Sequence, residues 1–310
     1  MSRTRRLREL IEAPAILVSP GVYDGYSARL VEAMGFSSAS TSGAGLVNAR
    51  LGVSETLGVL SMLENVDACR QLARVLSIPL MADADTGYGS AVTVFQTVQH
   101  FEEAGVSGIN IEDQTFPKRC GHYAGKALVS PQEMAKKIEA AVAARRDPDF
   151  IINARTDAVA VEGIDAAVAR AKLYAAAGAD MIFPDAVRDE DQIKRFVDEV
   201  GIPISINIGF AIRSRPTTPL IPIPRLQTMG VARVSVPRML PAAAIRAMRE
   251  SLALLHQTMT TGEVVDRPDL LVGIDEIQAL VGDDAVADLE RRFLTEGELT
   301  TRYGGEPAGI

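Results

Sequence analysis

Cysteine is scarce in this sequence, and so are long apolar runs. The 310 residues include two cysteines, Cys69 and Cys120, which are too few for a disulfide-stabilised scaffold and favour a reducing compartment. No apolar run approaches the roughly 20 residues that a membrane-spanning helix needs. The basic start, residues 1–10, is not followed by the apolar segment of a signal peptide. We therefore expect a cytoplasmic protein with no membrane partner.

Positive charge is also in short supply. The chain has 32 Lys and Arg against 40 Asp and Glu, a net charge of −8, which gives no general attraction for nucleic acid. An anionic substrate would have to be held by local cations or by a metal. The G-x-G-x-x-G turn of dinucleotide-binding sheets is missing as well, since the nearest candidate, Gly43-Ala44-Gly45, lacks the third glycine.

Short apolar runs alternate regularly with amphipathic segments along the chain. Hydrophobic residues make up 47% of the sequence and charged residues 23%, which is ordinary for a globular protein with a large core. Eight strands alternating with helices predict a (β/α)8 TIM-type barrel over residues 1–250, followed by a helical extension over residues 251–310. The predicted strands are Ala15–Val18, Ser37–Ser40, Pro79–Ala82, Gly108–Ile111, Phe150–Ala154, Met181–Phe183, Ile204–Ile206 and Arg233–Val236.

Carboxylates follow neighbouring predicted strands, where a barrel of this type carries its active site. Asp83 and Asp85 lie two residues apart, so an extended segment turns both side chains to one side, and Glu112 begins the next loop. These oxygen ligands suit Mg²⁺ better than Zn²⁺, which prefers histidine or thiolate. The alternative is that the aspartates cap helices or lie in solvated loops.

Cys120 belongs to the run Lys118-Arg119-Cys120-Gly121-His122. Neighbouring cations favour a thiolate, and Gly121 allows a loop to approach a ligand closely. We therefore expect a reactive thiol on a loop that closes over a substrate. Cys69, inside a predicted helix, is expected to be a small buried side chain instead.

Two further groups of residues suit an anionic substrate. Arg155 ends the fifth predicted strand, where its guanidinium could bind a carboxylate through two hydrogen bonds. The alternative for this side chain is an ion pair with Asp157 or Glu112. Ser42 and the two backbone amides that follow it could form an anion-binding nest ahead of a helix, or only a tight turn.

The order of these motifs resembles the isocitrate lyase/phosphoenolpyruvate mutase family. The matching segments are residues 23–29, 42–45, 83–89, 111–114, 118–122 and 154–157, and the resemblance runs from Arg6 to Met248. It implies a barrel that uses Mg²⁺, with Mn²⁺ as a substitute, and a homotetramer made of dimers that exchange a C-terminal helix. The Lys118–His122 run is similar to the family's lyase signature. The chain's length resembles the short-chain branch, which includes 2-methylisocitrate lyase and 2,3-dimethylmalate lyase.

The resemblance also implies a role for each matching residue. Cys120 would be the acid that protonates a carbanionic product, and Tyr23 and Asp185 are both candidates for the base relay. The implied residues are Asp83, Asp85 and Glu112 for the metal; Cys120, Tyr23, His122 and Lys118 for catalysis; and Ser42, Gly43, Ala44, Gly121, Arg155, Asp185, Asn207 and Thr218 for the substrate.

The expected reaction is cleavage of a substituted 2-hydroxy di- or tricarboxylate to pyruvate, or a related 2-oxo acid, and a second acid. The alternatives are a carboxyvinyl-carboxyphosphonate or phosphoenolpyruvate phosphonomutase, an oxaloacetate hydrolase or decarboxylase, and a binding barrel without catalysis.

The chain departs from the family pattern at four places. Ser54-Glu55-Thr56 replaces the usual Pro-Asp, so that a supporting acid is shifted or missing, and Asp185 replaces the usual Glu. Residues 123–126 and 213–215 also differ from those of 2-methylisocitrate lyases, which leaves room for a different substrate pocket.

Overall fold

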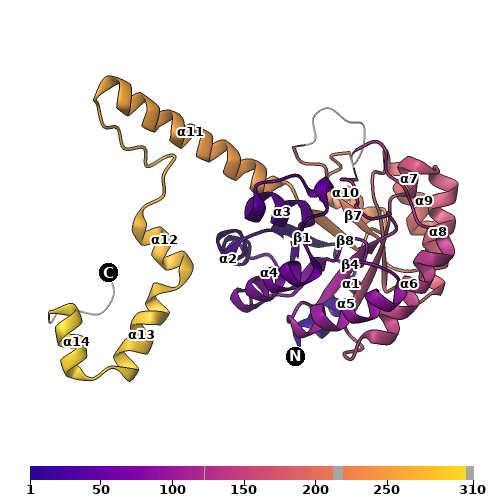
Figure 1. Cartoon of the computed structure of the whole chain (residues 1–310), viewed down its shortest axis with the longest axis horizontal. Helices are drawn as coiled ribbons and strands as arrows, with labels where there is room; N and C mark the ends of the chain where they lie inside the picture. Colours follow the sequence, from indigo (N-terminus) through magenta and orange to yellow (C-terminus); the bar gives the residue numbers. More distant parts are fainter. Residues whose placement is uncertain (122, 212–218, 305–310) are drawn as a thin grey trace. The chain divides into compact units, whose positions relative to one another are not determined.

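The computed structural model describes residues 1–121, 123–211 and 219–304. Eight parallel strands form the centre of its first unit, Met1–Ala242 (Figure 1). Their hydrogen-bonded order is β6-β5-β4-β3-β2-β1-β8-β7, and a parallel bridge from Ile182 to Ile204 joins β6 to the residue before β7. The strands thus form a nearly closed ring, which confirms the predicted TIM-type barrel. They are β1 (Leu17–Val22), β2 (Ala39–Thr41), β3 (Leu80–Asp83), β4 (Gly108–Glu112), β5 (Ile151–Thr156), β6 (Met181–Pro184), β7 (Ser205–Asn207) and β8 (Arg233–Val236).

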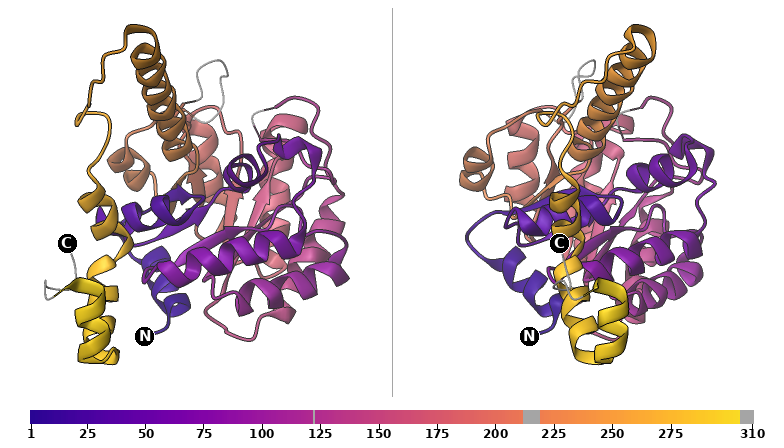
Figure 2. Two further views of the ribbon diagram at one scale, coloured as in Figure 1. Left: turned by 60° about the vertical axis from the view of Figure 1, so that its left-hand side comes forward. Right: turned by 90° about the vertical axis from the view of Figure 1, so that its left-hand side faces the viewer.

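Helices lie outside this ring in both further views (Figure 2). Local signals set their starts: Ser61 and Glu64 form a capping box ahead of α4, and Ser130 caps α6 just before Pro131. The helices of the barrel are α1 (Arg3–Glu12), α2 (Gly25–Ala33), α3 (Gly43–Leu51), α4 (Met62–Val75), α5 (Ala91–Glu103), α6 (Pro131–Ala144), α7 (Ala158–Val161), α8 (Ile164–Ala176), α9 (Glu190–Val200) and α10 (Ile223–Thr228), with a short 3-10 turn η1 (Glu55–Leu57).

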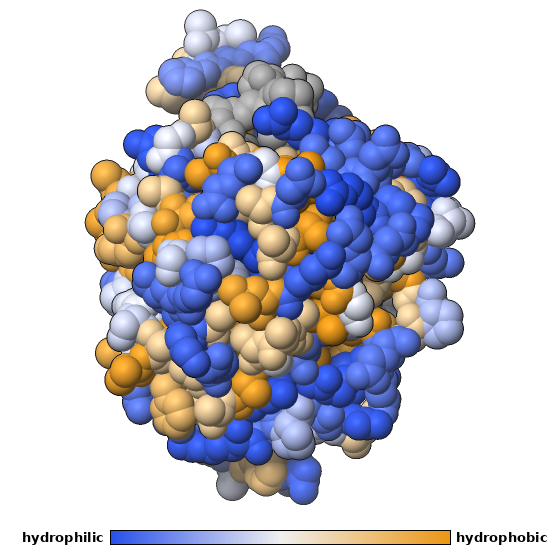
Figure 3. Space-filling model, turned by 90° about the vertical axis from the view of Figure 1, so that its right-hand side faces the viewer, coloured by the Kyte–Doolittle hydropathy of each residue, from blue (hydrophilic) through white to orange (hydrophobic). Residues whose placement is uncertain are grey.

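The helices bury one face against the strands. In α8 and α9 the buried positions include Val168, Tyr174, Ile193 and Phe196. The outward side of this region is largely hydrophilic, with hydrophobic side chains scattered between (Figure 3). This division is the usual one for surface helices that share a core with a sheet.

The first strand extends further than the sequence suggested. Pro20 and Gly21 have the appearance of turn residues, yet β1 pairs with β8 through Pro20↔Val236 and with β2 through Gly21↔Ser40. A Cβ at Gly21 would lie 2.6 Å from the backbone of Pro237. Only glycine therefore lets the end of β8 approach β1 this closely, and this approach fixes where the chain leaves the barrel at Pro237.

The barrel interior is apolar at one end and polar further along. The apolar end is a cluster of Leu7 and Ile11 from α1 with Leu17, Met81, Ile151 and Met181 from the strands. Elsewhere inside the barrel, Arg233 is fully buried and donates hydrogen bonds to the hydroxyls of Ser19, Ser40 and Ser205. Burial lowers the pKa of this guanidinium to about 10.

The chain divides into two compact units, Met1–Ala242 and Ala243–Ile310. Both this division and the predicted boundary at residue 250 fall within α11 (Met239–Thr261). The second unit continues with α12 (Ile274–Val281), α13 (Asp283–Phe293) and α14 (Glu296–Tyr303), and many of its large apolar side chains are exposed. Within the described ranges, no helix is both long and apolar enough to cross a bilayer.

Candidate active site

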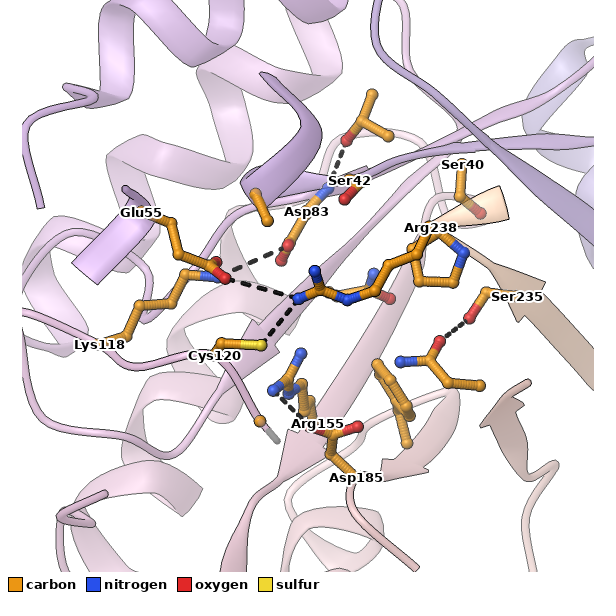
Figure 4. Close-up of a pocket in the computed structure, with 17 residues that line it drawn as sticks. Ser40, Ser42, Glu55, Asp83, Lys118, Cys120, Arg155, Asp185, Ser235 and Arg238 are labelled. Carbon is orange, nitrogen blue, oxygen red and sulfur yellow. Dashed lines mark hydrogen bonds and ion pairs between the residues drawn. The ribbon is translucent and has the colours of Figure 1, made fainter. Parts of the chain in front are cut away.

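A pocket at the C-terminal ends of the strands collects most of the predicted site residues (Figure 4). Because these ends share one rim of the barrel, side chains far apart in sequence meet there. The predicted residues on the pocket wall are Ser42, Ala44, Asp83, Lys118, Cys120, Gly121, Arg155, Asp185 and Asn207.

The other six predicted residues are not placed on this wall. Three of them lie beside it in the acidic cluster described below: Gly43, Asp85 and Glu112. Tyr23 follows β1, and its backbone N–H donates a hydrogen bond to Ser27; partial burial raises the pKa of its hydroxyl. His122 and Thr218 fall outside the described residues.

An acidic cluster forms one side of the site around the ammonium group of Lys118. The Lys118 Nζ atom is 2.7 Å from Asp85 Oδ1, 3.5 Å from Glu55 Oε2, 3.7 Å from Asp83 Oδ2 and 3.9 Å from Glu112 Oε2. Burial alone would lower the pKa of Lys118, but the surrounding carboxylates raise it well above its ordinary value. Burial raises the pKa of Asp85 and of Glu112.

Glu55 resolves a question that the sequence left open. The family's usual acid is absent at this point of the chain, and Glu55 on η1 supplies a carboxylate to the same cluster. Glu55 thus adds a fourth carboxylate to the cluster around Lys118.

The acidic cluster fits a hard divalent cation. Both carboxylate oxygens of Glu112 are buried and accept no hydrogen bond from any described residue. Gly43 N–H donates to Asp83 Oδ2 at 3.1 Å, and a Cβ at Gly43 would be 2.7 Å from that oxygen. Four carboxylates share one ammonium group, so the cluster is short of positive charge and rich in the oxygen ligands that Mg²⁺ prefers.

Lys118 lies where such a cation would be attracted. In the part of the chain that the structure describes, no three of these side chains converge as metal ligands do, and the ammonium group of Lys118 lies among them. Asp83, Asp85 and Glu112 therefore surround Lys118 as a group of candidate oxygen ligands.

Arg155 is the centre of the opposite side of the site. Its Nε atom donates to Asp157 Oδ2 at 2.9 Å, and its Nη2 atom donates to Asp185 Oδ2 at 2.7 Å. Glu112 Oε2 is 3.2 Å from Nε. Burial would lower the pKa of Arg155, but these carboxylates raise it well above its ordinary value. The ion pairs noted as the alternative for Arg155 are therefore formed.

Lys126 links this ion-paired group to the loop that carries the thiol. Its buried Nζ atom donates to Asp157 Oδ1 at 2.8 Å and to the carbonyl of Gly121 at 2.6 Å. A Cβ at Gly121 would lie 1.5 Å from Asp185 Oδ2, so glycine is required for the loop to approach this carboxylate.

The Cys120 thiol faces the pocket, and the cation beside it is one that sequence reasoning missed. Arg238, just after β8, places Nη2 at 2.7 Å from Cys120 Sγ (Figure 4). Arg119, an expected neighbour, is exposed and donates to the carbonyl of Ala124. In the sequence, the one feature that pointed to Arg238 was its position as a basic residue just after the last predicted strand. Cys69 is fully buried as expected, and burial raises its pKa to about 12.

Comparison with known proteins identifies the family of the chain. A family profile described as phosphoenolpyruvate phosphomutase matches residues 7–256. The chain belongs to this family. Among curated relatives, 2-methylisocitrate lyase of Aeropyrum pernix is 41% identical over 98% of this chain and 95% of its own length. The 2,3-dimethylmalate lyase of Eubacterium barkeri is 35% identical over 95% of this chain and 99% of its own.

Solved structures of the family superpose on most of this chain. A 2,3-dimethylmalate lyase superposes with a TM-score of 0.85 at 30% identity, covering 94% of this chain and 95% of that one. A phosphonopyruvate hydrolase in complex with oxalate and Mg²⁺ superposes with a TM-score of 0.82 at 30% identity, covering 95% and 100%. These likenesses confirm the predicted family and support the prediction of a carbon–carbon lyase.

Proposed function

We propose that this protein is a Mg²⁺-dependent lyase that cleaves a substituted 2-hydroxy acid of the 2-methylisocitrate or 2,3-dimethylmalate type. The products are pyruvate, or a related 2-oxo acid, and a second carboxylic acid. The observation that carries the proposal is a pocket-facing thiol, Cys120, between a carboxylate cluster that fits a metal and a guanidinium. A binding protein has no need of a thiol in this position.

The pocket offers groups for both proton transfers of such a cleavage. Asp185 Oδ1 is buried and accepts no hydrogen bond from the described residues, which favours Asp185 over Tyr23 as the base that takes the 2-hydroxyl proton. As the C2–C3 bond breaks, its electrons pass to C3 and the adjacent carboxylate, giving an enediolate. The Cys120 S–H then gives its proton to C3 and becomes a thiolate.

The remaining groups bind and orient the substrate. Bound Mg²⁺ would stabilise negative charge on the oxygens of the oxo-acid half. Ser42 and the first turn of α3 face this half, and Ser42 Oγ accepts a hydrogen bond from Gly45 at 3.1 Å. The proposal places the enzyme in the reducing cytoplasm, because Cys120 would act as a reduced thiol.

Oxo-acid release by the purified protein tests the proposal. The substrates are 2-methylisocitrate, 2,3-dimethylmalate, isocitrate and oxaloacetate, each with Mg²⁺ and with a chelator. We expect chelator-sensitive pyruvate from one of the first two, and a loss of about 10²–10⁴-fold in turnover for Cys120→Ser. No pyruvate from either substrate, or full turnover by the serine variant, would contradict the proposed reaction.

We also propose that the protein assembles as a homotetramer of helix-exchanged dimers. The barrel leaves an apolar groove that includes Val18, Ile208 and Val236, with Phe36 and Phe210 partly exposed at its edges. In the second unit, apolar side chains of α11–α13 such as Leu255 and Leu289 are more than half exposed. Exchange of helices between subunits would cover both surfaces. Sedimentation equilibrium measures the state directly, and a monomer at micromolar concentration would contradict it.

A further inference from the structure

Three basic side chains line the described part of the pocket: Lys118, Arg155 and Arg238. The first two are already engaged by carboxylates at 2.7 Å, from Asp85 and Asp185 respectively. An incoming substrate carboxylate would have to compete with these partners. Lys118 and Arg155 therefore both have a carboxylate partner at 2.7 Å within the protein.

Arg238 differs from the other two. Among described residues, its nearest carboxylate oxygen is Glu55 Oε1 at 3.8 Å, which is beyond hydrogen-bond distance. Its side chain is 36% exposed and reaches across the pocket from the end of β8 toward Cys120 (Figure 4). Its planar guanidinium has several N–H donors, so one can face Cys120 Sγ while others face a ligand.

We infer that Arg238 binds the substrate carboxylate that becomes the enediolate, and that it is a catalytic residue. The inference rests on the proposed lyase function. Cys120 delivers its proton to the carbon that bears this carboxylate, so the carboxylate oxygens must lie close to Sγ during the transfer. A guanidinium donor 2.7 Å from Sγ is within reach of the same oxygens.

The charge changes of the reaction explain why this position favours catalysis. When the C2–C3 bond breaks, the carboxylate gains the bonding electron pair and its oxygens carry close to two negative charges. After proton transfer, one negative charge has moved to Cys120 Sγ, and a carboxylate with one charge remains. Arg238 faces both charges in turn, so it stabilises the transition state more than the bound substrate. Its loss should therefore lower kcat.

The experiment compares Arg238→Met, Arg238→Lys and Arg119→Met. Arg119 is the matched control, because it carries the same charge on the Cys120 loop and does not line the pocket. Each variant is assayed for kcat and KM with the substrate that the wild type cleaves. Calorimetry with the Mg²⁺-loaded protein then measures the binding of two ligands. One is a nitronate, in which a nitro group replaces the carboxylate bound by Arg238 and mimics the enediolate. The other is pyruvate.

For Arg238→Met we expect kcat to fall about 10²–10³-fold and nitronate affinity to fall by a similar factor, with pyruvate affinity unchanged. Arg238→Lys should lose less, since it keeps the charge without the planar donors. Arg119→Met should match the wild type. Unchanged kcat in Arg238→Met, or a loss confined to KM, would overturn the inference while the lyase function stands. A wild type that neither cleaves these acids nor binds the nitronate would overturn both.

Discussion

The two sides of the pocket balance their charges differently. On the acidic side, Lys118 is the single ammonium group for four carboxylates. On the opposite side, Arg155 and Lys126 are matched by Asp157 and Asp185 at hydrogen-bond distances of 3.2 Å or less. Even with Arg155 Nε at 3.2 Å from Glu112 Oε2, the first side has fewer cations than carboxylates. On the second side both cations have a carboxylate at hydrogen-bond distance, although Asp185 Oδ1 accepts no hydrogen bond from the described residues.

Because of this difference, the acidic side is suited to binding a cation and the paired side to holding neighbouring groups in place. Buried carboxylates without enough counter-charge cost free energy until a cation arrives, so the acidic cluster gains most from a ligand. The paired side gains less from a cation, because Lys126 and Arg155 already donate to the Gly121 carbonyl and to Asp185. We therefore expect the loss of a carboxylate to change the free energy of unfolding in opposite directions on the two sides.

The largest effect is expected from Asp157→Asn on the paired side. Burial would raise the pKa of Asp157, but Arg155 and Lys126 hold it below its ordinary value. Asparagine would leave both buried cations short of counter-charge, and we expect a loss of about 3–5 kcal/mol in the free energy of unfolding. Urea denaturation measures this loss, with Asp165→Asn as the control because that side chain is 89% exposed.

The pH dependence of this loss has a definite sign. Because the pKa of Asp157 is depressed in the folded protein, its contribution is fully present above the ordinary aspartate pKa of about 3.9. It is lost only as the pH falls through the lower folded-state pKa. The gap between wild type and Asp157→Asn should therefore persist from neutral pH to about pH 4 and narrow below it. A gap that narrows already near pH 6 would contradict this assignment.

Sequence reasoning identified the fold and most of one rim because both depend on local patterns. Apolar runs gave the eight strands, and the residues after each strand gave Asp83, Asp85, Cys120 and Arg155. Strand ends were less certain: the second strand begins at Ala39 instead of Ser37, since its pairing with β3 starts at Ala39↔Leu80. Boundaries of this kind are set by neighbouring strands, which no short window of sequence contains.

Pairwise contacts across the rim could not be predicted in the same way. Arg238 and Cys120 are 118 positions apart, and their approach depends on Gly21 allowing Pro237 to pack against β1. We expected Arg155 to bind a substrate carboxylate, whereas in the structure its N–H groups donate to Asp157 and Asp185. Both outcomes depend on which charges the barrel brings together, and spacing along the chain does not carry that information.

For Asp85→Asn on the acidic side, we expect a smaller change in the free energy of unfolding than for Asp157→Asn, and of the opposite sign. Burial raises the pKa of Asp85, so removing this charge from the metal-free protein should change the free energy of unfolding by no more than about 1 kcal/mol, or raise it. The wild type should gain about 2.7 kcal/mol at a Mg²⁺ concentration 100 times the Kd, and the variant should lose that gain. Thermal unfolding with Mg²⁺ and with a chelator measures both, with the exposed Asp67→Asn as the control. If Mg²⁺ stabilises Asp85→Asn as strongly as the wild type, the metal binds elsewhere. The difference in charge between the two sides of the pocket would then not explain metal binding.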